Sequence, residues 1–141
     1  MKILFATDGS PFALLALKTL AGMLDRFREP LEIVLLNVHP PLPYRGAAGW
    51  AGKEAIDRYY DEEGEAAFAD SRQLLEALNV SFTPIKAVGD VAQGIVAHAG
   101  AAGCEFIAMG THGGGALSNL VLGSVTTKVL ALAAIPVLLL K

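Results

Sequence analysis

Uninterrupted apolar runs recur along the chain, each bounded by glycine, proline or polar residues. Such short runs are typical of strands that are buried on both faces, as in a parallel sheet. One run is less continuous and contains Pro84, which favours an edge position because proline cannot donate a backbone hydrogen bond. The predicted strands are Ile3–Ala6, Leu31–Val38, Val80–Val88, Glu105–Met109 and Val137–Leu140.

Between these runs, apolar residues recur at helical spacing and follow residues that commonly begin helices. Ser10 precedes Pro11, and Asp90 is followed by Gln93 three residues later, as in a capping box. The predicted helices are Pro11–Arg28, Lys53–Leu78, a helix that follows the Asp90 cap, and Ser124–Ala133. Alternating strands and helices predict an α/β protein with one doubly wound parallel sheet and helices on both faces.

One stretch, residues 39–53, is rich in proline and glycine and is predicted to be the long loop of the chain. Long loops in compact domains are often functional. Its aromatic residues, Tyr44 and Trp50, would either cover a ligand or contact a partner, or the loop would pack on its own helix. The sequence leaves these alternatives open.

Composition narrows the class of protein. The 141 residues, 53% of them hydrophobic with a net charge of −3, predict one domain over residues 1–141. Lysine and arginine do not cluster, so we expect no nucleic-acid surface. The apolar runs are too short to span a membrane, and a strand begins where a signal peptide would lie, so we expect a cytoplasmic protein. The single cysteine, Cys104, is expected to be a core residue.

The stretch 109–126 follows a predicted strand and contains five glycines before a predicted helix. Glycines let the backbone approach a ligand closely, and a helix N-terminus adds unpaired N–H groups and positive dipole, so together they favour a phosphate site. No lysine lies in the loop, which excludes a Walker-type phosphate loop, and Ser118 breaks the dinucleotide pattern G-x-G-x-x-G. The alternative is that the glycines serve only a tight turn.

The remaining spacing is Gly110-x-x-Gly113, nine residues, and then Gly123-Ser124. It resembles the ATP-binding signature of the universal stress protein family. The resemblance extends to residues 3–10, I-L-F-A-T-D-G-S, and to the closing I-P-V-L-L-L at 135–140. It implies an adenine nucleotide alpha hydrolase-like fold of five parallel strands in the order 3-2-1-4-5. It also implies a homodimer formed through the C-terminal edge strand, residues 136–140.

In that strand order, the first and fourth strands meet at the switch point where such sheets bind ligands. The resemblance implies ATP, with or without Mg²⁺, in contact with residues from both strand ends. Contacts with adenine are implied for Ala6, Thr7, Asp8 and Val38, and contacts with phosphate and ribose for Gly110, Gly113, Gly123, Ser124, Val125 and Thr126; Met109 and His112 complete the candidate set. For Asp8, a structural role as a helix cap is the alternative.

His112 stands where many members of the family carry arginine, so no fixed cation is expected in the loop. An unperturbed histidine has a pKa of about 6.5, which suggests that phosphate affinity depends on Mg²⁺ and rises as His112 becomes protonated. A solvated loop histidine is the alternative. His39 and His98 are expected to be structural.

No residues are assigned as catalytic or metal-binding, because no nucleophile–base arrangement or metal-ligand spacing is present in the sequence. The leading hypothesis is an ATP-binding, dimeric stress-response module without a dedicated reaction. The alternatives are a slow ATP-hydrolysing or other nucleotide-handling enzyme, in which Asp8 and His112 would activate water, and a ligand-free interaction dimer.

Overall fold

The computed structural model describes residues 1–42, 45–114 and 121–141, with the side chains of residues 45–51 left out. Its strands form one parallel sheet in the order β3-β2-β1-β4-β5, as predicted. The strands are β1 (Lys2–Ala6), β2 (Glu32–His39), β3 (Ser81–Val88), β4 (Phe106–Gly110) and β5 (Val137–Leu140). The helices are α1 (Pro11–Ala21), α2 (Arg45–Ala77), α3 (Val91–Ala101) and α4 (Ser124–Leu132), with a short 3₁₀ helix at Leu24–Arg26.

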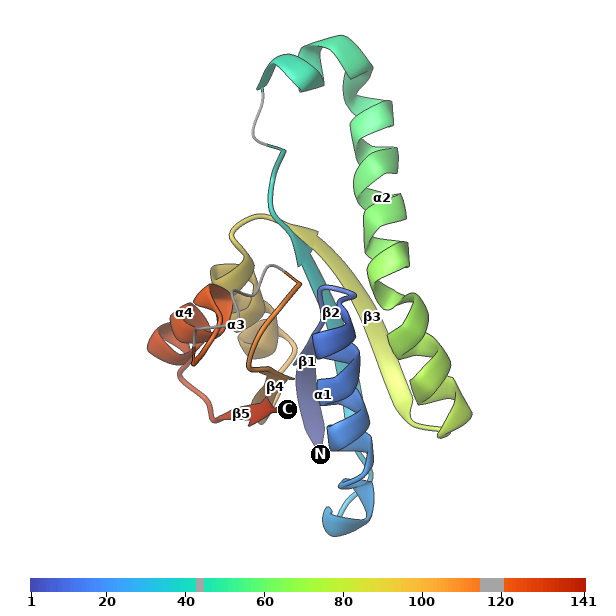
Figure 1. The fold of residues 1–141 in the computed structure, drawn as a ribbon, viewed down its shortest axis with the longest axis vertical. Coiled ribbons are helices and arrows are strands. Elements are labelled where there is room, and N and C mark those ends of the chain that lie inside the picture. Colours follow the sequence, from blue (N-terminus) through green and yellow to red (C-terminus); the bar gives the residue numbers. More distant parts are fainter. Residues whose placement is uncertain (43–44, 115–120) are drawn as a thin grey trace.

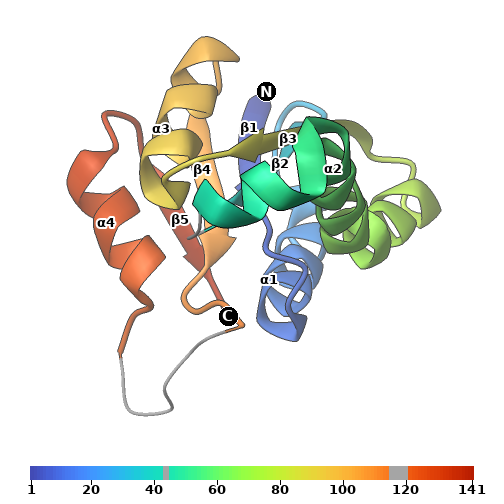
Figure 2. The same ribbon diagram turned by 90° about the horizontal axis from the view of Figure 1, so that it is seen from above.

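The helices cover both faces of the sheet. Helices α1 and α2 lie on one face, and α3 and α4 lie on the other (Figures 1 and 2). Side chains alternate along each strand, so the central strands supply two apolar layers. In β2, for example, Leu35 packs toward α1 and α2 while Leu36 packs toward α3, and both are fully buried. The edge position predicted for the strand that contains Pro84 is confirmed, since β3 has β2 as its neighbour and ends the sheet.

Helix α1 ends earlier than predicted, at Ala21 instead of Arg28. Gly22 caps it, and the chain then makes a 3₁₀ turn before Phe27 takes up an extended conformation. Phe27 stacks on Phe106, with 6.4 Å between ring centroids. Glycine is a poor helix former, which favours the end of the helix at Gly22. The contact of Phe27 with Phe106 also requires the chain to leave the helix before Phe27. Tertiary contact therefore outweighs the helical spacing of the apolar residues. Ser10 caps the start of α1 as expected and accepts a hydrogen bond from the Ala13 N–H at 3.2 Å.

The predicted long loop at residues 39–53 is also wrong, because a helix begins at Arg45. The three prolines of the stretch all precede Arg45, so none of them prevents the helix that follows. A kink at Gly52, with φ of 74°, separates this first segment from the main part of α2. Tyr44 and the side chain of Trp50 lie outside the described residues.

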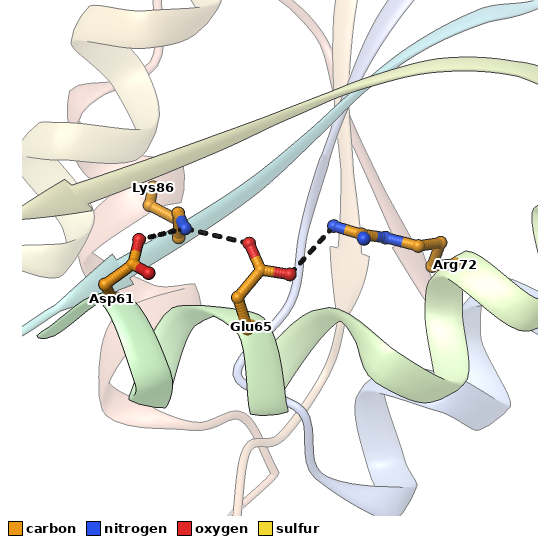
Figure 3. Close-up of polar contacts among 4 residues, drawn as sticks. All are labelled: Asp61, Glu65, Arg72 and Lys86. Atoms are coloured by element: carbon orange, nitrogen blue, oxygen red, sulfur yellow. Dashed lines mark hydrogen bonds and ion pairs between the residues drawn. The ribbon is translucent and has the colours of Figure 1, made fainter. Parts of the chain in front are cut away.

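Helix α2 packs against the edge strand β3 through one buried stripe, which contains Gly64 and Phe68. Lys86 of β3 crosses the helix at Gly64, where the absence of a side chain leaves room for the lysine stem. Its ammonium group contacts Asp61 and also Glu65, at 2.8 Å, and Arg72 contacts Glu65 at 3.1 Å (Figure 3). Gly64, which looks unfavourable in a helix, therefore allows close packing.

Cys104 is confirmed as a core residue, 6% exposed in the layer beneath α3. Burial raises the pKa of its thiol, which disfavours the reactive thiolate. Among the helices of the described residues, none combines the length and the apolar character that a membrane span requires.

Candidate functional site

A cavity of about 450 Å³ opens at the carboxyl edge of the sheet, between β1, β2 and β4 and the first turns of α3 and α4. This is the switch point of the sheet, because the chain leaves β1 toward α1 on one face and leaves β4 toward α4 on the other. The volume falls within the range of pockets for small molecules. A smaller hollow of about 330 Å³ adjoins it and shares Val91, Ser124 and Val125 with it.

The inner part of the cavity is an apolar slot. Ala6, Leu36, Val38 and Met109 face it from three neighbouring strands because side chains at alternate positions share one face of the sheet. Val91 and Ile95, one turn apart at the start of α3, add further apolar surface. A slot with apolar surface from both sheet and helix suits a flat ring system such as a nucleobase.

The rim of the cavity is built by the turn that follows β1. The Thr7 carbonyl accepts a hydrogen bond from the buried Asn37 side chain at 2.9 Å, which ties the turn to β2. The next-but-one residue, Gly9, has φ of 76°, and a side chain there would lie 2.7 Å from the Ala67 backbone of α2. Glycine is therefore required at this close approach. The contacts of Thr7 with Asn37 and of Gly9 with Ala67 fix the turn on either side of Asp8, which lies at the rim of the cavity.

Asp8 joins the two strand ends that the sequence predicted to converge. One carboxylate oxygen accepts the Ser10 N–H at 2.9 Å, and the other accepts the Gly114 N–H, also at 2.9 Å. Gly113 lies so close that a Cβ atom there would be 2.6 Å from the Asp8 Oδ2. Ser10, rather than Asp8, is the N-cap of α1. Asp8 thus holds the glycine loop against the β1 turn.

The N-terminus of α4 forms the opposite wall of the cavity. Thr127 N donates to the Gly123 carbonyl at 3.0 Å and makes the first intrahelical bond, so the N–H groups of Ser124, Val125 and Thr126 precede the hydrogen-bonded ladder. These three residues line the cavity. Glycine at position 123 provides no side-chain cap that would occupy those N–H groups. The geometry therefore provides an anion site at the helix end.

The buried Thr126 hydroxyl has a structural role. It donates toward the carbonyls of Gly110 and Thr111, at 3.2 and 3.3 Å, and so links α4 to the end of β4. The Gly123 N–H adds a second link, to the Thr111 carbonyl at 2.8 Å. These bonds set the position of the helix N-terminus relative to the sheet.

Two titratable side chains, Asp8 and His112, are among the described residues that line the cavity, together with no lysine or arginine. The His112 Nδ1 lies 3.0 Å from the Thr111 hydroxyl. In the described part of the chain, no three histidine, cysteine, aspartate or glutamate side chains are grouped as a metal site would require. Among the described residues, the charge of the cavity therefore comes from one carboxylate, one imidazole and backbone dipoles.

All twelve candidate residues of the sequence analysis line this one cavity: Ala6, Thr7, Asp8, Val38, Met109, Gly110, His112, Gly113, Gly123, Ser124, Val125 and Thr126. Five further residues were missed: Ala13, Leu36, Val91, Ile95 and Gly114. Leu36 could have been found, since it lies two positions before Val38 on the same face of β2. Val91 and Ile95 carry no local signal, because they reach the site only through the packing of α3.

The other two histidines lie outside the cavity lining. The His98 Nδ1 lies 2.7 Å from the Gly94 carbonyl within α3, and the His39 Nδ1 lies 2.6 Å from the Pro40 carbonyl. His39 also packs edge-on against Tyr59 and Tyr60, on the face of the sheet opposite the cavity. The structural roles predicted for both histidines agree with these contacts.

The fold and the site together define an α/β domain with a cavity at the switch point of its sheet, where proteins of this architecture bind ligands. Comparison with known proteins is more specific. The model of the universal stress protein family matches residues 1–141, and the chain belongs to this family. Universal stress protein MJ0531 of Methanocaldococcus jannaschii is 31% identical over 141 residues, which cover 99% of this chain and 81% of that protein.

Solved structures share the fold. The structure of hypothetical protein MJ0577 aligns with a TM-score of 0.82 and 30% identity, over 99% of this chain and 94% of that one. A universal stress protein family member from Arabidopsis thaliana, solved with AMP bound, aligns with a TM-score of 0.66 over 100% of this chain and 91% of its own. Its identity of 14% makes it evidence for the fold alone.

Proposed function

We propose that this protein binds ATP in the cavity and acts as a dimeric stress-response signalling module whose loaded state is the signal. The observation that supports it is the union, within one cavity, of an apolar slot and a helix N-terminus with three backbone N–H groups outside the helical ladder. A nucleotide needs both, one for its base and one for its phosphates. The Arabidopsis structure, which shares the fold, was solved with AMP bound, so a protein of this fold can hold an adenine nucleotide.

In this proposal the base enters the slot formed by Ala6, Val38 and Met109, and the phosphates lie against the glycine loop and the first turn of α4. The Ser124 side chain is exposed at that turn, where its hydroxyl would donate to a phosphate. Thr126 would contribute its backbone N–H, because its hydroxyl is already engaged with Gly110 and Thr111. The proposed contacts are thus mostly backbone contacts.

The residues of the cavity fit Mg²⁺ only if the ion is bound together with the phosphates of the nucleotide. Magnesium is commonly bound by one or two carboxylates together with substrate phosphates. Asp8 is the one carboxylate among the described residues of the cavity. When bound, the ion would neutralise phosphate charge beside Asp8, which would hold it through one oxygen or through water.

The proposal is tested by identifying the nucleotide that copurifies with the protein. The protein is purified without added nucleotide and denatured, and the released small molecules are separated by anion exchange and identified by mass. We expect ATP in near-equimolar amount. Gly113→Val should lose it, because the new side chain would collide with the Asp8 carboxylate and displace the loop.

The matched control is Gly100→Val, at a helical glycine where an added Cβ atom would meet no heavy atom within 4 Å. This variant should retain the nucleotide. AMP or ADP in place of ATP, together with multiple turnovers on added ATP, would favour the slow nucleotide-handling enzyme. A wild-type protein that copurifies empty and does not bind added ATP with Mg²⁺ would refute the proposal and favour the ligand-free interaction dimer.

The dimer would form through β5, the outer strand of the sheet, whose free edge can pair with a second copy. Phe12 and Leu15 flank this edge on α1 and are 51% and 53% exposed. We expect a dimer at micromolar concentration by light scattering, and a monomer for Leu15→Asp. Leu78→Asp, at a leucine of similar exposure, 44%, in the turn that follows α2, should remain a dimer. A monomeric wild type would contradict the proposal.

A cytoplasmic location is part of the same proposal.

A further inference from the structure

The smaller hollow beside the cavity lies at the N-termini of α3 and α4, two helices that lie side by side on one face of the sheet (Figure 2). The hollow and the cavity adjoin, because Val91, Ser124 and Val125 line both. Pro40 and Pro41, which follow β2, form another part of the wall of the hollow. A ligand that occupies the cavity can therefore extend past Ser124 into the hollow.

The hollow contains a cation of the kind that the cavity lacks. Among the described residues, no lysine or arginine lines the cavity, whereas Lys128 lines the hollow. Lys128 follows Ser124 by four residues in α4, so the two lie on one side of the helix with their Cβ atoms about 5–6 Å apart. Side chains of a helix point toward its N-terminus. The Lys128 ammonium group is therefore directed toward the end of α4 where the proposed phosphates bind.

The charge of Lys128 is not balanced by the protein. In the part of the chain that the structure describes, Lys128 makes no ion pair. A cation near a helix N-terminus is also unfavourable, because the helix dipole is positive there. The carboxylate of the hollow, Asp90, is engaged at the other helix, where its Oδ1 accepts the Gln93 N–H at 2.9 Å and caps α3. An anionic group of a ligand would supply the counter-charge.

We infer that Lys128 binds the terminal phosphates of the nucleotide and makes the site prefer a triphosphate to a monophosphate. This inference rests on the proposed nucleotide function and extends the site beyond the glycine loop. A monophosphate ends at the loop and the first turn of α4, whereas the β- and γ-phosphates of ATP continue past Ser124 into the hollow. Lys128 thus distinguishes ligands by the length of their phosphate chain.

The size of the effect follows from the exposure of the lysine. Lys128 is exposed, so water screens its attraction for a phosphate, and about tenfold in affinity is expected for ATP. AMP should gain less than about twofold, because its single phosphate lies farther from the ammonium group, and adenosine should gain nothing. In about 0.5 M NaCl, the contribution to ATP binding should fall below about threefold, since salt screens exposed charges.

The experiment titrates ATP, AMP, adenosine and inorganic tripolyphosphate, each with Mg²⁺, into wild type and Lys128→Met by calorimetry. Methionine keeps the apolar stem of the lysine and removes its charge. We expect the variant to bind ATP about tenfold more weakly, and AMP and adenosine nearly as wild type does. Lys128→Arg should retain tight ATP binding, because arginine also donates to phosphate.

The matched control is Lys18→Met. Lys18 is also exposed, and it lies in the last turn of α1, at the end of the helix remote from the cavity, which contacts α1 near its start at Ala13. This variant loses the same charge but should bind all four ligands as wild type does. Tripolyphosphate should bind wild type much more weakly than ATP, because it has no base for the apolar slot.

Thermal unfolding separates a contact with ligand from a structural role. Without ligand, Lys128→Met should have the Tm of wild type or a higher one, since no ion pair is lost and a cation is removed near the positive end of α4. ATP should then raise the Tm of the variant less than that of wild type. A variant that is destabilised without ligand and binds ATP, AMP and adenosine equally weakly would overturn the inference.

The titrations also separate the inference from the proposed function. Unchanged ATP affinity in Lys128→Met, an equal loss in Lys18→Met, or equal losses for ATP and AMP would each overturn the inference while nucleotide binding stands. If tripolyphosphate binds wild type as tightly as ATP, the hollow binds free polyphosphate on its own, and the inference is again overturned. If wild type binds none of the nucleotides or adenosine, the proposed function fails, and the inference fails with it.

Discussion

The carboxyl edge of the sheet is hollow on one face and filled on the other, and two consecutive residues of β2 show the contrast. Val38 lines the cavity beneath α3 and α4. His39 points to the opposite face, where its ring lies 5.6 Å from that of Tyr59 and 5.3 Å from that of Tyr60. The Tyr60 hydroxyl in turn accepts the Leu42 N–H at 2.9 Å. The same strand thus contributes to the cavity on one face and to a packed aromatic cluster on the other.

The difference arises from where the helices begin. Helices α3 and α4 start at the edge of the sheet, at Val91 and Ser124, so their N-termini face open space. Helix α2 extends beyond the edge of the sheet (Figure 1), and its Tyr59 and Tyr60 pack against His39 on the other face. In the described residues, the cavity is thus bordered by the two helices that begin at the edge of the sheet and not by the helix that extends beyond it. The three predictions below test that contrast.

The largest effect is expected from a matched pair of leucines. Leu35 and Leu36 are adjacent in β2 and both fully buried, but Leu35 faces the filled layer and Leu36 faces the cavity. Leu35→Ala should cost about 4 kcal/mol in the free energy of unfolding, and Leu36→Ala about 2–3 kcal/mol, because Leu36 already lacks neighbours on its cavity side. Urea unfolding measures both, and equal costs would show that the cavity is closed in solution.

Sequence patterns predicted the sheet well because the strands are short apolar runs whose burial is a local property. The convergence of the candidate residues on one cavity was predicted for a similar reason. Its polar parts are two local motifs, Thr7-Asp8 and Gly110-x-x-Gly113, and the topology of a doubly wound sheet brings their strand ends together.

The remaining features depend on contacts between distant segments. The early end of α1 follows from the contact of Phe27 with Phe106, and the hydrogen bond from Gly114 to Asp8 spans more than a hundred residues. The start of α2 at Arg45 is different, because the proline content of the stretch suggested a loop although every proline precedes the helix. Position of the prolines, rather than their number, was the informative signal there.

An intermediate effect is expected from two glycines of α3. A Cβ atom at Gly94 would lie 3.0 Å from the Val38 side chain, whereas one at Gly100 would meet no heavy atom within 4 Å. Gly100→Ala should raise the free energy of unfolding by up to about 1 kcal/mol, as alanine does in helices. Gly94→Ala should give no such gain, because it pushes Val38 toward the cavity, and it should also weaken nucleotide binding. If thermal unfolding showed equal stabilisation by Gly94→Ala and Gly100→Ala, and nucleotide binding by Gly94→Ala were unchanged, the close contact between Gly94 and Val38 would be contradicted.

The smallest effect is expected on the filled face, from Lys86→Met. Methionine keeps an apolar stem across Gly64 but removes the contacts with Asp61 and Glu65. Exposed ion pairs contribute little and are screened by salt, so the loss of stability at pH 7 should be the least of the three predictions and should shrink further in 1 M NaCl. Chemical unfolding at both salt concentrations measures it.

The pH dependence of that difference follows from two shifted pKa values. The hydrogen bond with Lys86 lowers the pKa of Glu65, so this contribution is present above the unfolded pKa of Glu65 and is lost as the pH falls through the folded one. Hydrogen bonds with Asp61 and Glu65 raise the pKa of Lys86, so its contribution is present below the unfolded pKa and is lost as the pH rises through the folded one. The difference between wild type and Lys86→Met should therefore be constant near neutral pH and decrease as the pH falls through the folded pKa of Glu65.

Lys53→Met is the control, because Lys53 is 91% exposed and its contact with Asp57, at 4.0 Å, lies within one helix. It should change stability less than Lys86→Met, since an exposed ion pair within one helix does not connect that helix to another helix or strand. The Lys86 contacts join α2 to the edge strand β3 (Figure 3). If the two variants lose the same stability, charge pairing adds nothing to the α2–β3 contact. Packing around Phe68 alone would then hold the filled face.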